Sequence, residues 1–93
     1  MFHKTNFDDY EALGDFIKEY RKHYGLTLEK LANSLNLSKD SISKYERMDR
    51  TPELNQLLKI QNFFALDDQD LAVLLMYQFI KVQIKKRDTH EFN

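Results

Sequence analysis

The stretch LEKLANSLNLSKDSISKYER, residues 28–47, decides the fold of this chain. Its apolar residues are confined to the positions at which two crossed helices would touch. These residues are Leu31, Leu35, Leu37, Ile42 and Tyr45. Ala32 is small where the helices would cross closely, and Asn36 tolerates the left-handed backbone of a tight turn. The pattern therefore predicts two short helices joined by that turn.

Two helices with this spacing form a helix-turn-helix motif, whose second helix usually lies in the major groove of DNA. Thr27 and Ser38 stand directly before the two helices, where their side chains can cap free backbone N–H groups. A preceding helix is expected to start near Asn6 or Asp8 and to end at Gly25. Its inward stripe consists of Leu13, Phe16, Ile17, Tyr20 and Tyr24.

The sequence after residue 47 predicts two further helices. Pro52 suits the first position of the fourth helix, and Asp67 or Asp68 can cap the fifth. The residues that we expect the fourth helix to bury are Leu54, Leu57, Leu58, Ile60, Phe63 and Phe64. The chain is therefore predicted to be all-α with five helices.

The segment from Leu71 to Ile84 contains 11 apolar residues among 14, too few to span a membrane, which takes roughly 20. Residues 80–85 alternate like a short strand, but no Gly or Pro separates them from the fifth helix. We therefore favour one extended C-terminal helix, with the strand as the alternative. A small domain cannot bury every face of such a helix, which predicts contact with a second chain. The expected dimer interface consists of Leu74, Met76, Tyr77, Ile80, Val82 and Ile84.

The charge of the chain is low for a protein that binds DNA. Its 14 Lys and Arg residues and 15 Asp and Glu residues give a net charge of −1. Residues 1–11 carry a net −2, residues 12–66 a net +2 and residues 67–93 a net −1. Because affinity for phosphate is mostly electrostatic, we expect non-specific binding to be weak and sensitive to salt.

The sequence does not indicate catalysis. Without cysteine the chain has no disulfide and no thiolate metal site, which suits a reducing cytosol, and its N-terminus does not resemble a signal peptide. His3, His23 and His90 are too scattered for a metal site. The chain has no Gly-rich phosphate loop, and its serines have no base partner. We expect a cytoplasmic protein that is not an enzyme and has no cofactor, metal, membrane or small-molecule ligand.

Several short motifs fall in register with one known pattern. They include Leu13-Gly14, Gly25-Leu26-Thr27, Leu31-Ala32, Ile42-Ser43, Tyr45-Glu46-Arg47 and Leu57-Leu58-Lys59-Ile60. Through them residues 13–71 resemble the Cro/C1-type (XRE) helix-turn-helix family. The resemblance implies a lambda-repressor-like domain of five helices that binds palindromic operator DNA as a homodimer. The expected function is a sequence-specific transcriptional regulator, and specifically a repressor.

The resemblance and the composition of the flanking segments divide the chain, and roles can be assigned to single residues. Residues 1–12 would be an extension with the start of the first helix, 13–71 the domain, 72–86 a dimerisation segment and 87–93 a polar tail. The base-reading positions are Lys39, Asp40, Ser43 and Lys44. The expected phosphate contacts come from Thr27, Ser38, Arg47 and Arg50. Arg21 and Glu46 occupy positions that form a salt bridge in related domains.

Two positions depart from the family pattern. Leu28 replaces a common Gln that holds a phosphate oxygen, and Met48 replaces a common Gly, although Met disfavours a positive φ. Leu28, the low charge and the apolar C-terminal segment support an alternative function. That alternative is a protein-interaction module with the same helical shell, such as an antitoxin that binds a toxin or an adaptor that sequesters a regulator.

Overall fold

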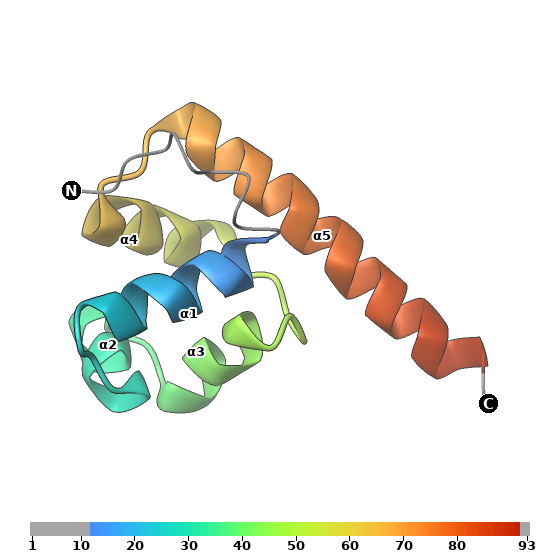
Figure 1. Ribbon diagram of the computed structural model, residues 1–93, viewed down its shortest axis with the longest axis horizontal. Coiled ribbons are helices and arrows are strands. Elements are labelled where there is room, and N and C mark those ends of the chain that lie inside the picture. The colour runs from blue at the N-terminus through green and yellow to red at the C-terminus, as the bar shows by residue number, and fades with distance from the viewer. Residues whose placement is uncertain (1–11, 92–93) are drawn as a thin grey trace.

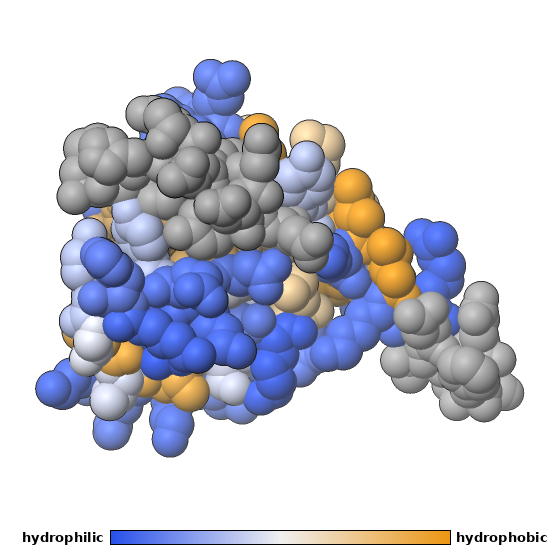
Figure 2. Space-filling model, viewed as in Figure 1, coloured by the Kyte–Doolittle hydropathy of each residue, from blue (hydrophilic) through white to orange (hydrophobic). Residues whose placement is uncertain are grey.

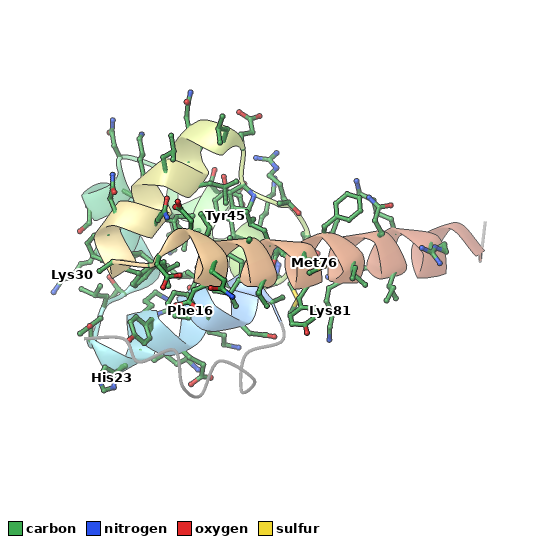
Figure 3. All side chains as sticks on the ribbon, turned by 90° about the horizontal axis from the view of Figure 1, so that it is seen from above. Phe16, His23, Lys30, Tyr45, Met76 and Lys81 are labelled. Carbon is green, nitrogen blue, oxygen red and sulfur yellow. The ribbon has the colours of Figure 1, made fainter. Side chains whose placement is uncertain are left out.

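The computed structural model describes residues 12–91, with side chains to residue 87, and these residues form five α-helices (Figure 1). The helices are α1 (Leu13–His23), α2 (Leu28–Leu35), α3 (Lys39–Glu46), α4 (Leu54–Phe64) and α5 (Asp68–Glu91). No strand occurs in the described part of the chain, so the all-α prediction is confirmed. Helices α1 to α4 form a body, and α5 crosses it and continues past its edge (Figures 1 and 3).

One hydrophobic core joins all five helices. Its fully buried apolar side chains are Leu13, Phe16 and Ile17 of α1, Leu31 of α2, Ile42 of α3, Ile60 of α4 and Leu74 of α5. The ring of Phe16 meets the ring of Phe64 edge to face, with 5.3 Å between the centroids. Because α3 contributes to this shared core, its orientation is set by the packing of the whole body.

The start of α1 depends on a contact from a distant part of the chain. Ala12 precedes the helix with extended backbone and offers no side-chain cap. The amide N–H of Gly14 donates instead to Oε1 of Gln78 on α5, at 2.7 Å. The helix thus begins after Ala12, and the start predicted near Asn6 or Asp8 lies outside the described residues.

Helix α4 begins later and buries less than the sequence predicts. Glu53 is its N-cap, so the prediction that Pro52 is its first residue is wrong. Leu54, Leu58 and Phe63 are 70%, 49% and 40% exposed, which corrects their placement in the core. The other apolar residues predicted for this helix are buried or half-buried. Helix α4 thus buries Ile60 and Phe64 in the core and leaves Leu54, Leu58 and Phe63 at the surface.

Helix α5 runs without interruption to Glu91, so the strand alternative is wrong and the helix continues through most of the predicted polar tail. Asp67 caps it, with its Oδ1 accepting from the N–H of Asp70 at 2.8 Å. One face packs on the body, and hydrophobic side chains also lie along the part that extends past the body (Figure 2). Within residues 12–91, no helix has the length and apolar character needed to cross a membrane.

Candidate nucleic-acid interface

The turn between α2 and α3 has the geometry that its residues predict. Asn36 holds the left-handed conformation, with φ 56° and ψ 45°. The N–H of Leu37 then donates to the carbonyl of Ala32 at 2.8 Å, which closes the end of α2. This turn fixes the angle between α2 and α3.

Both helices of the motif carry the predicted side-chain caps. Thr27 Oγ1 accepts from the N–H of Lys30 at 3.0 Å, and Ser38 Oγ accepts from the N–H of Ser41 at 3.0 Å. Each cap satisfies one of the free N–H groups at its helix start and leaves others directed outward. The N-terminus of α2 therefore retains the donors that a phosphate requires.

The four positions predicted to read bases lie on the outer face of α3. Lys39 and Asp40 are exposed, while Ser43 and Lys44 are half-buried. Lys44 Nζ lies 3.1 Å from Asp40 Oδ2 one turn away. Because the Asp40 side chain is 72% exposed, this ion pair is weak and can exchange for contacts to a ligand. Figure 1 shows that α3 lies at the edge of the body, away from α4 and most of α5.

The loop after α3 contains the two arginines predicted to contact phosphates. Arg47 Nη1 donates to Ser43 Oγ at 2.6 Å, and Arg47 Nε lies 2.9 Å from Asp49 Oδ2. Hydrogen bonds from Lys85 and Arg47 hold the pKa of Asp49 below its ordinary value. Burial raises the pKa of the Tyr45 hydroxyl, and this effect exceeds the lowering caused by the nearby positive charge of Arg50.

The salt bridge expected between Arg21 and Glu46 is present in the structure. Arg21 Nε lies 2.6 Å from Glu46 Oε2, and its Nη2 lies 3.1 Å from Oε1. The remaining guanidinium nitrogen donates to the carbonyl of Leu26 at 3.0 Å. The side chains are only 13% and 7% exposed, and the bond to Glu46 raises the pKa of Arg21. This bidentate pair fixes the C-terminal end of α3 on α1.

Gln78 supports this site structurally, although it belongs to none of the sequence motifs. It is fully buried on α5, and its Nε2 donates to the carbonyls of Arg50 at 3.2 Å and Tyr45 at 3.4 Å. Together with its bond to the amide of Gly14, the side chain joins α1, the end of α3 and the following loop. A Cβ on Gly14 would lie 2.2 Å from the Tyr45 carbonyl, so only glycine permits this approach. The sequence signal for it is a glutamine that is the one polar residue among residues 71–80.

The structure also places the residues that depart from the family pattern. Leu28 is half-buried and packs against the core, which removes the support it gave to a protein contact. Met48 has φ 60°, so α3 ends in the left-handed conformation that the usual glycine would adopt, although a methionine there is strained.

The residues predicted for a dimer interface separate into two groups. Leu74 and Val82 are 0% and 5% exposed within the single chain, so they support the fold and cannot offer surface to a second chain. The other four lie on the exposed side of α5 and are 44–54% exposed: Met76, Tyr77, Ile80 and Ile84. Among the described residues, no cluster of His, Asp or Glu could hold a metal ion.

Comparisons with known proteins agree with this geometry. A family model described as helix-turn-helix matches residues 17–71. The HTH-type transcriptional regulator ImmR of Bacillus subtilis (strain 168) is 38% identical over 53 residues, which cover 57% of this chain. The match spans 42% of the length of that regulator. No solved structure matches the chain significantly.

Proposed function

Because this chain belongs to the Cro/C1-type helix-turn-helix family, we propose that it is a transcriptional regulator that recognises a specific DNA sequence through α3. The observation that supports this proposal is the outer face of α3, which carries Lys39, Asp40, Ser43 and Lys44. The caps of α2 and α3 and the Arg21–Glu46 salt bridge hold this face in a fixed orientation on the body. A fixed helix with exposed donors and acceptors is suited to a groove lined by base edges.

The side chains of α3 provide the chemistry for reading bases. Lys39 and Lys44 can donate to O6 and N7 of guanine, and Asp40 can accept from N4 of cytosine. The Lys44–Asp40 pair breaks when either side chain turns to a base. Because that pair is exposed, its loss costs little compared with the hydrogen bonds that either side chain can form with a base.

Phosphate contacts would then set the register of α3 along the groove. The free N–H groups at the start of α2 next to Thr27 can bind one phosphate, and those after Ser38 another. Arg47 and Arg50 extend this set past the end of α3. The net charge of −1 leaves little general attraction for DNA, so specific contacts must provide much of the affinity.

We further propose that two copies bind a palindromic operator and act as a repressor. The exposed apolar side of α5 is the surface through which a second copy would pack. A twofold dimer would place its two recognition helices about 34 Å apart, one turn of the duplex. Occupancy of such a site would then exclude other proteins from the same DNA.

The test is binding to the DNA upstream of the chain's own gene, measured by fluorescence anisotropy at several salt concentrations. We expect the wild type to form a specific complex. Lys39→Ala and Lys44→Ala should each make the binding free energy less favourable by about 1–3 kcal/mol, because each removes a contact to a base. Lys18→Ala removes the same charge from the exposed side of α1, outside the proposed interface, and should bind like the wild type. Absence of a complex with the wild type at low salt would refute the proposal.

A further inference from the structure

A chain of polar contacts connects the recognition helix to the distal half of α5. Lys85 Nζ forms an ion pair with Asp49 and lies 3.4 Å from the carbonyl oxygen of Arg47. The other carboxylate oxygen of Asp49 binds Arg47 Nε, and Arg47 Nη1 binds Ser43 Oγ. Ser43 is one of the proposed base-reading residues. Lys85 is therefore connected to the DNA-facing surface through two intervening side chains.

A groove lies beside this network, between the loop after α3 and α5. It has a volume of about 360 Å³. Its lining residues are Asp49, Arg50, Thr51, Phe79, Val82, Gln83 and Lys86. The groove brings Lys86 to the same loop as Arg50, although 36 positions separate the two in the sequence.

The groove and the network gather positive charge in a chain whose net charge is −1. Among the described residues named here, Arg47, Arg50, Lys85 and Lys86 are the cations and Asp49 is the one carboxylate. The Asp49 carboxylate bridges Arg47 and Lys85, which are 55% and 53% exposed. An anionic oxygen of a ligand can approach the same two cations from solvent.

We propose that Lys85 and Lys86 extend the DNA-contacting surface from the loop onto α5 and bind backbone phosphates beside the groove that α3 reads. The inference rests on the proposed function, because it is the position of α3 that makes DNA the ligand. In this arrangement Asp49 orients Arg47 and Lys85 toward the phosphates, and Lys86 adds a contact across the groove from Arg50. The surface recognises the charge and spacing of phosphates and no particular base.

The experiment measures the dependence of affinity on salt for Lys85→Gln, Lys86→Gln and the double variant of the full chain. The probes are a duplex of the DNA upstream of the chain's own gene and a random-sequence duplex of equal length. The logarithm of the binding constant falls linearly with the logarithm of the salt concentration. Each lost phosphate contact makes this fall less steep by about 1. We expect each single variant to show that decrease, the double variant to show about twice the decrease, and both duplexes to be affected alike.

Lys18→Gln is the matched control, because it removes one positive charge from the exposed side of α1. It should keep the wild-type slope. Lys86→Gln breaks none of the contacts that connect Asp49 to Lys85 and Arg47. Its effect on the slope therefore reports the loss of one charge alone, with that network intact. Wild-type slopes for both single variants would overturn this inference alone. A wild-type chain without affinity for either duplex would overturn the proposed function as well.

Discussion

Three residues other than glycine hold a left-handed backbone among residues 12–91, and each ends a helix. They are Asn36 after α2, Met48 after α3 and Ala65 after α4, with φ of 56°, 60° and 55°. Asn adopts this conformation at low cost, because its short polar side chain bonds locally. Met and Ala do not, so α3 and α4 end at positions under backbone strain.

Ala65→Gly should raise the free energy of unfolding by about 1 kcal/mol, because glycine adopts φ 55° without a steric clash. Ala65 is exposed, so the substitution loses little buried surface. Urea denaturation followed by circular dichroism measures the change. Ala72→Gly is the control, since Ala72 is exposed inside α5, and it should lower stability by about 1 kcal/mol. Destabilisation by both variants would contradict the strain at Ala65.

Met48 differs from Ala65 because its side chain contributes to packing. Its Cγ would lie 3.1 Å from a Cβ on Gly14, so the methionine covers the point where α1 approaches the end of α3. The strain of its backbone and the contact of its side chain oppose each other. Met48 therefore replaces the usual glycine of the family and also packs against Gly14.

Helix α5 is attached to the end of α3 by polar contacts as well as by the core. Leu74 and Val82 bury apolar surface, which does not by itself specify how far α5 is shifted or rotated on the body. The three hydrogen bonds of Gln78 have fixed directions and specify both. Helix α5 thereby holds the loop that contains Arg47 and Arg50.

Gln78→Met should lower the free energy of unfolding by about 2 kcal/mol, because it keeps the volume of the side chain but leaves the buried Gly14 amide without a partner and removes a donor from the carbonyls of Tyr45 and Arg50. Urea denaturation gives the stability, and hydrogen exchange at the Gly14 amide should become faster. Gln69→Met changes an exposed residue of the same helix and should be close to neutral. Equal stability of the two variants would show that the hydrogen bonds of Gln78 are not needed.

Helix α5 has apolar side chains both toward the body and on the side that faces solvent. Leu71, Leu74 and Val82 face the body, while Met76 and Ile80 are 54% and 45% exposed on the other side. A contiguous apolar surface of this kind is uncommon on a monomer and is typical of an interface. The proposed dimer would bury it and connect two recognition helices at the same time.

Ile80→Glu should reduce the proposed dimer to a monomer, because it places a charge at the centre of the apolar side of α5 while leaving the core intact. Sedimentation equilibrium or light scattering measures the mass. Leu58→Glu makes the same change at an exposed leucine of α4 and should preserve the dimer. A wild-type chain that stays monomeric at high concentration would contradict the proposal and favour a different protein as the partner of α5.

Local rules predict much of this protein from its sequence. The caps at Thr27 and Ser38 and the left-handed turn at Asn36 depend on neighbouring residues only. The candidate positions on α3 follow from that motif and from the family resemblance, which are both properties of the sequence. The same rules failed at Leu54 and Leu58, since an apolar residue on a helix at the edge of the body has no partner to cover it.

Neighbouring residues are thus sufficient to specify the helix-turn-helix and the exposed face of α3. The tertiary structure alone decided how α5 lies, which of its apolar residues are buried, and that Gln78 and Lys85 reach the end of α3. The physical reason is that a helix with apolar residues on every side carries no periodic signal for one face. Its orientation is chosen by the surface that the other four helices offer and by hydrogen bonds between residues more than 25 positions apart.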